Sequence, residues 1–157
     1  MKRKDSPHQV FYESPIGWVQ ISGTPEALTG LVFFDAPAES ISCSLLDEAV
    51  GQVQEYFSGK RTEFELPLET GGTDFQQQVW SQLRAIPFGS LRAYQDIANI
   101  LNNPKAVRAV GMANGQNPIS VIIPCHRVIG SDGKLTGYGG GLWRKEWLLR
   151  HEGALLL

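Results

Sequence analysis

The sequence predicts an α+β fold in which a small antiparallel sheet and a helix form the N-terminal part, and a mainly α-helical part with a helix-turn-helix follows. Short apolar runs divided by turn-forming residues occupy the beginning of the chain, as expected of strands. Apolar residues recur every three or four positions through most of the remainder, which is typical of amphipathic helices. Gly71-Gly72 marks the boundary, so we expect an N-terminal domain over residues 1–70 and a C-terminal domain over residues 71–157.

The N-terminal domain is expected to contain three strands and one helix. Segments rich in Ser, Pro and Gly separate the strands, which cover residues 10–12, 18–21 and 28–34. The helix follows from four apolar residues at spacings of 4, 3 and 4, namely Leu46, Val50, Val53 and Phe57. Residues 61–68 form either another strand or an extended linker, and Pro67 favours an edge position over a central one.

The C-terminal domain is expected to be built from four helices. The first begins after Thr73, a good N-cap residue, and ends before the Pro87-Phe88-Gly89 segment. Its apolar stripe consists of Phe75, Val79, Leu83 and Ile86. The helices that follow cover residues 93–101, 105–114 and 143–151. A tight turn ending in Pro104 joins the middle two, which is the helix-turn-helix pattern.

Charge and cysteine content narrow the functional classes. The net charge of −2 divides into 5 Lys and Arg against 11 Asp and Glu over residues 1–70, and 9 against 5 over residues 71–157. A basic half hints at a polyanionic partner, although ordinary surface variation explains it equally well. No apolar run approaches the roughly 20 residues that span a bilayer, so no membrane association is expected. Cys43 and Cys125 are too far apart to suggest a disulfide framework, which predicts a reducing, cytoplasmic setting.

The segment Pro124-Cys125-His126-Arg127 follows the apolar run 121–123 and is the strongest chemical signal. A thiolate is the nucleophilic form of cysteine, and a neighbouring His can take the thiol proton. Because His126 is adjacent in sequence, a water relay to Cys125 is more plausible than direct contact. Glu152, at the end of the last helix, is a candidate partner that would orient the His. Cys43 has no such neighbours and is expected to be a small core residue.

The second helix of the helix-turn-helix has an unusual composition. A reader of the major groove needs Asn, Gln or Arg to address base edges, whereas this helix offers mainly small residues and Arg108. Small side chains suit a narrow groove, and one long cation suits the space that an extruded base leaves. The alternative is a small-residue helix packed inside the domain, with Arg108 simply solvated.

The chain resembles the O6-alkylguanine-DNA alkyltransferases. The resemblance covers nearly all of residues 71–157, with a fainter likeness at 14–17. It rests on a series of motifs in order: Gly72-Thr73-Asp74-Phe75-Gln76, Ile86-Pro87-Phe88-Gly89, Tyr94, Arg108-Ala109-Val110-Gly111, Asn117-Pro118, Pro124-Cys125-His126-Arg127-Val128-Ile129, Gly137-Tyr138-Gly139-Gly140-Gly141 and Lys145-Glu146-Trp147-Leu148-Leu149. The family fold, with a small N-terminal sheet and a helical C-terminal domain, agrees with the fold expected above.

The resemblance implies a role for each matching residue. Cys125 would take the alkyl group from guanine O6, His126 would be the base acting through a water, and Glu152 would support it. Asn117 would organise the turn before the Cys segment, and Tyr94 would help to rotate the flipped nucleotide and protonate the leaving guanine. The remaining positions would contact DNA or the alkylated base: Arg108 as the finger that fills the base stack, Ala106, Ala109, Gly111 and Arg127 on the DNA, and Tyr138, Gly139 and Val128 in the pocket.

The resemblance also implies a substrate and the absence of a cofactor. The partner would be double-stranded DNA containing O6-alkylguanine, with O4-alkylthymine as a second substrate. The protein would be a monomer. The thioether product cannot readily be cleaved by water or a second thiol, so each molecule should react once. Some relatives bind zinc through Cys and His, but Asp5 and Thr24 stand at the apparent Cys positions, and no metal is expected. Val107 is bulkier, and Gly139 smaller, than the residues some relatives carry there.

Three other functions fit parts of the sequence. A transcriptional regulator could use the helix-turn-helix and sense damage through the thiol, but no sensor or activation domain accompanies it. A thiol hydrolase could use the Cys, His and Glu, but no oxyanion hole or peptide cleft is evident. A lesion-binding protein of related fold could bind without transfer, but such relatives lack the Cys found here.

Overall fold

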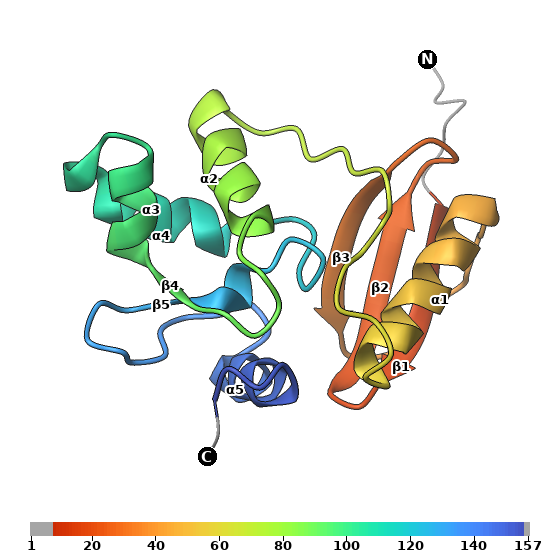
Figure 1. The fold of residues 1–157 in the computed structure, drawn as a ribbon. Coiled ribbons are helices and arrows are strands. Elements are labelled where there is room, and N and C mark those ends of the chain that lie inside the picture. Colours follow the sequence, from red (N-terminus) through yellow and green to blue (C-terminus); the bar gives the residue numbers. More distant parts are fainter. Residues whose placement is uncertain (1–7, 156–157) are drawn as a thin grey trace. The chain divides into compact units, whose positions relative to one another are not determined.

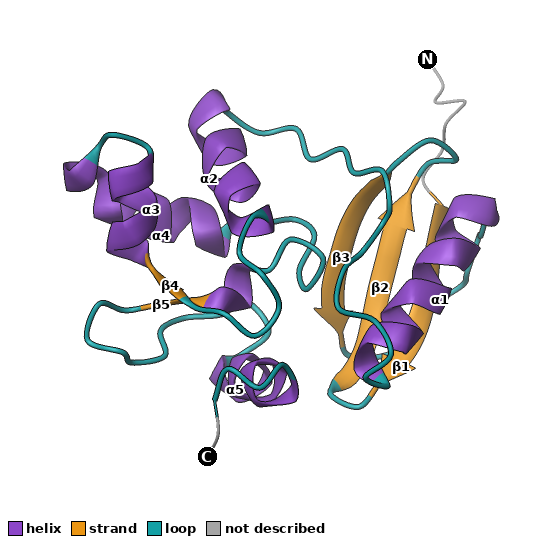
Figure 2. Ribbon diagram, viewed as in Figure 1, coloured by secondary structure: helices purple, strands orange, loops and turns teal. Residues whose placement is uncertain are grey.

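The computed structural model describes residues 8–155, which form two compact units divided between Thr70 and Gly71 (Figure 1). The first unit contains the strands β1 (His8–Ser14), β2 (Gly17–Gly23) and β3 (Leu28–Phe34), followed by the helix α1 (Ser44–Phe57). The second unit contains α2 (Asp74–Arg84), β4 (Arg92–Ala93), α3 (Tyr94–Ile100), η1 (Pro104–Ala106), α4 (Val107–Gly115), η2 (Cys125–Arg127), β5 (Val128–Ile129) and α5 (Leu142–His151). The predicted α+β class is confirmed, with strands concentrated in the first unit and helices in the second (Figure 2).

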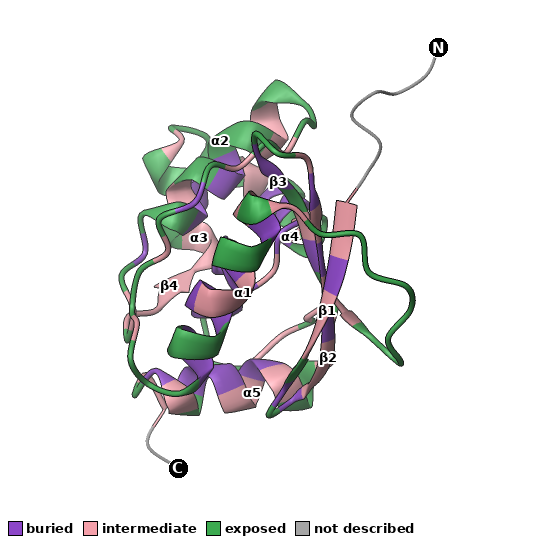
Figure 3. Cartoon of the chain, turned by 90° about the vertical axis from the view of Figure 1, so that its right-hand side faces the viewer, coloured by how far each residue is buried: buried purple, intermediate pink, exposed green. Residues whose placement is uncertain are grey.

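The three strands of the first unit form an antiparallel sheet in the order β1-β2-β3. Val10 pairs with Ile21, which in turn pairs with Leu31, so one apolar row crosses all three strands. The helix α1 packs against β1 and β2. Its buried face turns inward and its exposed face outward (Figure 3). That face is rotated slightly from the predicted stripe, since Ala49 and Tyr56 are fully buried whereas Val50 is only half-buried.

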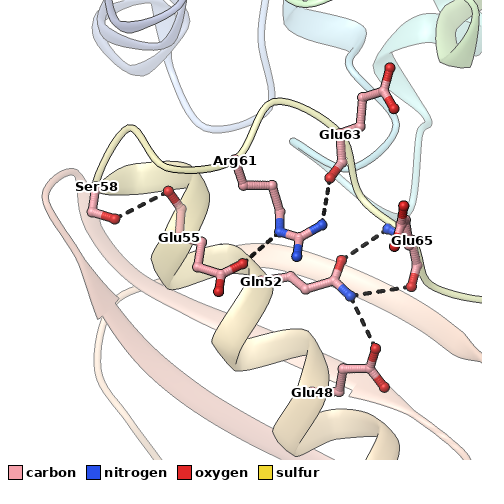
Figure 4. Close-up of polar contacts among 7 residues, drawn as sticks. All are labelled: Glu48, Gln52, Glu55, Ser58, Arg61, Glu63 and Glu65. Atoms are coloured by element: carbon pink, nitrogen blue, oxygen red, sulfur yellow. Dashed lines mark hydrogen bonds and ion pairs between the residues drawn. The ribbon is translucent and has the colours of Figure 1, made fainter.

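Residues 61–68 run as an extended segment rather than as a strand, with a single bridge between Leu28 and Leu68. Polar side chains of α1 satisfy its backbone instead (Figure 4). Gln52 accepts from the Glu65 N–H at 2.9 Å and donates to the Glu65 carbonyl at 3.2 Å. Arg61 pairs with Glu55 at 2.7 Å. The helix therefore holds this segment in place without a fourth full strand.

The second unit begins with a capping box that fixes the start of α2. The Thr73 hydroxyl accepts from the Gln76 N–H at 3.1 Å, and the Gln76 side chain accepts from the Thr73 N–H at 2.9 Å. Gly72 has a φ of +87°, and a Cβ there would lie 2.9 Å from the Trp80 ring, so only glycine fits. Trp80 is itself buried and donates from Nε1 to the Ala113 carbonyl at 2.8 Å. This bond fixes α2 against the end of α4.

The helix-turn-helix consists of α3 and α4, with a short 3₁₀ turn, η1, where the sequence predicted the first turn of the second helix. Pro104 opens that turn, and α4 proper begins at Val107. A two-residue parallel pairing of β4 with β5 was not predicted. It places the residues before Tyr94 alongside the residues after Cys125, so it brings α3 close to the cysteine segment. None of the helices within residues 8–155 is long and apolar enough to cross a lipid bilayer.

Candidate active site

Cys125 is presented by an unusual piece of backbone. The Ile122 N–H donates to the Ser120 carbonyl at 2.8 Å, which closes a three-residue turn around Val121 with a φ of 71°. A positive φ in a β-branched residue is strained, and burial of the Val121 side chain, 1% exposed, holds it there. A second tight turn follows, in which the Cys125 N–H donates to the Ile123 carbonyl at 2.7 Å. These two turns fix the direction from which the thiol is presented.

Asn117 spans the same segment with both ends of its side chain. Its Nδ2 donates to the Ile123 carbonyl at 2.7 Å, and its Oδ1 accepts from the Ile119 N–H at 2.9 Å. The carbonyl of Ile123 therefore accepts from both Asn117 and the Cys125 backbone. Asn114, which the sequence did not single out, adds a contact from α4, since its Nδ2 lies 3.4 Å from the Cys125 carbonyl. Two amides thus anchor the backbone around the thiol.

The Cys125 side chain is 5% exposed, and this burial raises the pKa of its thiol. A hydrogen bond from the Asn117 side chain and the charge of Lys145 act in the opposite direction and favour the thiolate. Burial outweighs them, so the resting thiol is protonated at neutral pH. A reaction at this sulfur therefore needs a base to take its proton.

His126 and Glu152 form a buried pair that can provide this base. The Nε2 of His126 lies 2.7 Å from Oε2 of Glu152, and both side chains are fully buried. Burial alone would raise the pKa of Glu152, but the hydrogen bonds and charges of His126 and Arg127 outweigh it and hold the pKa well below its usual range. The carboxylate is therefore ionised and can only accept, so Nε2 of His126 must carry the proton. This leaves Nδ1 as the bare, basic nitrogen.

The Nδ1 of His126 has no hydrogen-bond partner among the described residues, although it is buried. Burial lowers the pKa of His126, and the hydrogen bond and charge of Glu152 oppose this shift only in part. The ring is consequently neutral at physiological pH and has one free acceptor. A neutral imidazole with a fixed tautomer, in the residue that follows a buried thiol, suits general-base catalysis.

Arg127, which the resemblance placed on the DNA, has partners inside the unit. Its side chain is buried, and its Nε and Nη2 donate to Glu152 at 2.8 and 3.0 Å. Its Nη1 donates to the Ile86 carbonyl at 2.6 Å, and the guanidinium lies 5.8 Å from the centre of the Phe88 ring. With these three donors bound inside the unit, Arg127 holds Glu152 and the segment at 86–88. Its contact with DNA stays a prediction, and these internal bonds do not favour it.

Lys145 is a site residue that sequence reasoning missed. It is fully buried, its Nζ donates to the Thr136 carbonyl at 3.0 Å, and it lies 6.0 Å from the centre of the Tyr94 ring. Burial lowers its pKa to about 8, and the charge of Cys125 partly opposes the shift. A signal was present in the sequence, because Lys145, Leu148, Leu149 and Glu152 share the spacing of one buried stripe. A lysine on such a stripe must be buried with the leucines.

The other predicted pocket residues lie in the segments around Cys125. Burial raises the pKa of Tyr138 well above its usual value, and the charge of Cys125 adds to the shift. Tyr94 opens α3, and its hydroxyl lies 2.8 Å from that of Thr136. Val128 is fully buried in β5, whereas Gly139 is exposed and a Cβ there would meet nothing within 4 Å.

The helix α4 turns a small-residue face outward. Arg108 and Ala109 are exposed, while Ala106, Val107 and Gly111 are half-buried. Met112, one turn after Arg108, is 66% exposed and was not singled out from the sequence. The opposite face, formed by Val110, Ala113 and Asn114, is buried. The helix therefore presents one long cation among short side chains rather than packing all of its small residues inside.

No metal centre accompanies this site within residues 8–155, where no three His, Cys, Asp or Glu side chains gather to hold an ion. Thr24 accepts backbone N–H groups from Glu26 and Ala27 through its hydroxyl. Asp5, the other position considered for a zinc ligand, lies outside the described residues.

Comparison with known proteins connects both units to one family. Residues 8–70 match the ribonuclease-like domain of 6-O-methylguanine DNA methyltransferase, and residues 74–154 match its DNA binding domain. A methylated-DNA–protein-cysteine methyltransferase of Methanosarcina barkeri is 50% identical over 147 residues, which cover 89% of this chain and 93% of that protein. The crystal structure of Mycobacterium tuberculosis O6-methylguanine methyltransferase has 45% sequence identity and a TM-score of 0.86, over 94% of this chain and 93% of that one.

A second M. tuberculosis structure, of the protein in complex with DNA, matches with a TM-score of 0.87 and 46% identity, over 94% of this chain and 93% of that one. The similarity thus extends through both units and through the cysteine segment, the helix-turn-helix and the final helix alike. From these matches, this chain belongs to the 6-O-methylguanine DNA methyltransferase family.

Proposed function

We propose that this protein repairs O6-alkylguanine in double-stranded DNA by transferring the alkyl group to its own Cys125. The observation that carries the proposal is the bare Nδ1 of His126, whose tautomer Glu152 fixes, in the residue that follows the protonated, buried thiol of Cys125. The curated relatives at 46–50% identity are methylated-DNA–protein-cysteine methyltransferases, which fits this chemistry. O4-alkylthymine presents an alkyl group on an equivalent exocyclic oxygen and is a second candidate substrate.

The reaction would proceed as one displacement. Nδ1 of His126, acting through a water, takes the Cys125 proton as the sulfur approaches the alkyl carbon. The S–C bond forms while the C–O6 bond breaks, and the electron pair of that bond stays on the guanine. Tyr94 supplies a proton to the leaving guanine. Glu152 holds the His126 tautomer that makes the first step possible, and Asn117 holds the backbone that presents the sulfur.

The product would be a thioether, which explains why each molecule should act once. A C–S bond of this kind is not cleaved by a neutral base, by water or by a thiol at neutral pH, because thiol exchange requires a disulfide. Cys43 is the other cysteine, and it belongs to the N-terminal unit, where its Sγ contacts the Thr24 carbonyl at 3.9 Å. No resolving cysteine follows Cys125 in the sequence. Transfer is therefore stoichiometric and irreversible.

The C-terminal unit would bind the DNA and the N-terminal unit would support it. The exposed face of α4 offers Arg108 with Ala106, Ala109 and Gly111, which suits close approach to the minor groove. A buried thiol cannot reach a base inside a duplex, so the damaged nucleotide would be flipped out, at a cost of a few kcal/mol. Arg108 would fill the gap it leaves, and Tyr138, Gly139 and Val128 would surround the flipped base.

The decisive experiment mixes the protein with an oligonucleotide duplex carrying one O6-methylguanine and measures the intact mass of the protein. A gain of one methylene on Cys125, located by peptide mapping and saturating at one per molecule, is expected. Cys125→Ser should bind the same duplex without gaining mass. An unchanged mass of the wild-type protein with retained binding would instead indicate a lesion sensor or a regulator.

Arg108→Ala tests base flipping separately from chemistry. Single-stranded DNA has no base stack to fill, so the variant should slow transfer from a duplex more than transfer from a single strand. Arg84→Ala, an exposed arginine on α2, is the control. Equal slowing on the two substrates would remove the role assigned to Arg108.

The working form would be a monomer in the cytoplasm. Both cysteines are free, which is the usual state in a reducing compartment. Size-exclusion chromatography of the protein alone and fractionation of cells that produce it would test these two statements.

A further inference from the structure

Thr136 lies in the glycine-rich loop between β5 and α5 and binds two site residues at once. Its hydroxyl is 2.8 Å from the hydroxyl of Tyr94, and either oxygen can be the donor. Its carbonyl accepts from Nζ of Lys145 at 3.0 Å. Tyr94 comes from the start of α3 and Lys145 from the first turns of α5. A single loop residue therefore links the helix-turn-helix to the final helix at the active site.

The two halves of the Thr136 side chain have different surroundings. Its methyl group, Cγ2, lies 3.6 Å from the position a Cβ would take at Gly130, so the methyl lies close to the beginning of the loop. The hydroxyl has Tyr94 as its partner. A valine at this position would keep the methyl and lose only the hydrogen bond, whereas a serine would keep the hydrogen bond and lose only the methyl. The two contributions can therefore be separated by substitution.

Tyr94 needs a fixed hydroxyl for the part it has in the proposed reaction. A half-exposed tyrosine can rotate about two side-chain bonds, and a phenol that rotates freely donates to the leaving guanine only part of the time. Hydrogen bonding to Thr136 removes this freedom before DNA arrives. Once the phenol has given its proton away, the oxygen bears a negative charge and can only accept, and the Thr136 hydroxyl is then a donor within reach. The Lys145 amine lies 6.0 Å from the centre of the Tyr94 ring, so a cation is also close to this oxygen.

We propose that Thr136 is a positioning residue of the transfer reaction: its hydroxyl holds the Tyr94 phenol in place and donates to the Tyr94 oxygen after that phenol has protonated the leaving guanine. The proton passes from Tyr94 to the guanine, the C–O6 bond breaks and the S–C bond forms, and Thr136 keeps its own proton throughout. The carbonyl of Thr136 fixes Lys145 at the same time, independently of the side chain. This inference rests on the proposed function of Tyr94.

The experiment is a double-mutant cycle on the full-length protein with a duplex carrying one O6-methylguanine. Single-turnover transfer is followed with protein in excess, at several protein concentrations, so that the rate constant of transfer and the half-saturating concentration are obtained separately. Thr136→Val should lower the rate constant about 3- to 10-fold, the effect of losing one hydrogen bond in a transition state, with half-saturation within about twofold. Thr136→Ser should stay within about twofold of wild type in both.

The second arm uses Tyr94→Phe, which removes the hydroxyl that Thr136 binds. If Thr136 acts through that hydroxyl, Thr136→Val should have no further effect on the rate constant in the Tyr94→Phe background. Ser131→Ala, an exposed hydroxyl in the same loop, is the control for loop changes and should leave the rate unchanged. Thermal unfolding of every variant confirms that the same fraction of protein is folded.

The outcomes are distinct. The inference is supported if Thr136→Val slows transfer, Thr136→Ser transfers as fast as wild type, and Thr136→Val has no further effect in the Tyr94→Phe background. A Thr136→Val protein as fast as wild type overturns it, as does slowing that persists in the Tyr94→Phe background or that Thr136→Ser shares. If Tyr94→Phe alone is as fast as wild type, the role of Tyr94 fails together with this inference, while methylation of Cys125 still stands. Absence of any mass gain on Cys125 would contradict the proposed function itself.

Discussion

Replacing Glu152 with Gln tests whether one carboxylate supports both the base and the fold. The glutamine has the same shape but no charge, and one of its two terminal atoms becomes a donor. In the wild type, Glu152 accepts from His126 at 2.7 Å and from Arg127 at 2.8 and 3.0 Å, and its side chain is fully buried. The substitution therefore leaves the buried guanidinium of Arg127 without a counter-charge and places an amide N–H against a donor.

The expected loss of stability is large. Breaking a buried ion pair by removing one partner costs about 3–5 kcal/mol, because the remaining charge is left in a poorly solvating interior. At about 2–4 °C per kcal/mol for a chain of this size, Tm should fall by roughly 6–20 °C. Glu146→Gln on the same helix is the matched control. Glu146 pairs with Arg150 at the surface, where both side chains are more than 40% exposed, and such a pair contributes about 0–1 kcal/mol.

The contribution of Glu152 to the free energy of unfolding should decrease in acid. The pKa of Glu152 is lower in the folded protein than in the unfolded chain, so its stabilising contribution is present above the unfolded pKa of about 4.3 and is lost as the pH falls below it. The difference in stability between wild type and Glu152→Gln should shrink in acid. Urea unfolding at neutral and acidic pH, followed by circular dichroism, measures both values. A difference below about 1 kcal/mol at neutral pH, or one that acid leaves unchanged, would refute the reasoning.

Three further predictions concern the reaction. The pKa of His126 is lowered by burial, so the acidic fall in the transfer rate should lie below pH 6.5, the ordinary His value, in a rapid-quench pH series; a midpoint at or above 6.5 would contradict this. Because Lys145 is charged at neutral pH and its charge favours the Cys125 thiolate, Lys145→Met should slow the alkylation of Cys125 by iodoacetamide at pH 7, whereas an unchanged rate would show that the charge does not reach the sulfur. Gly139→Ser should slow transfer from O6-benzylguanine more than from O6-methylguanine, because the serine side chain would fill open space that the larger alkyl group could otherwise use. An unchanged ratio of the two rates would reject this idea.

Elements with a long apolar pattern were predictable from the sequence. The helix α2 was expected from its cap and stripe, and the capping box of Thr73 with Gln76 is present. The predicted stripe continued to Ile86, whereas the helix ends at Arg84 and Ile86 is buried from the loop that follows. Periodicity reports burial, and a buried loop residue near a helix end has the same pattern.

Short elements and distant partners were not predictable in the same way. The pairing of β4 with β5 involves two residues on each side, which is too short for any alternation of polar and apolar residues. The resemblance placed Arg127 on the DNA, whereas its partner in the structure is Glu152, which lies 25 positions away in the sequence. Sequence spacing indicates which residues share a helix face. It does not show which charged residue of another element will pair with a given side chain.

The left-handed turn at Val121 has a consequence for engineering this protein. Glycine would relax the strain of about 1–3 kcal/mol that such a conformation stores, so a search for stability would favour it there. The same change would let the peptide that carries Cys125 sample several orientations. A poorly aligned encounter leaves Cys125 unreacted, so a mobile peptide would not use up the protein but would lengthen the time that each lesion waits for transfer. Rigidity at Val121 thus contributes to the speed of repair, which a melting curve does not measure.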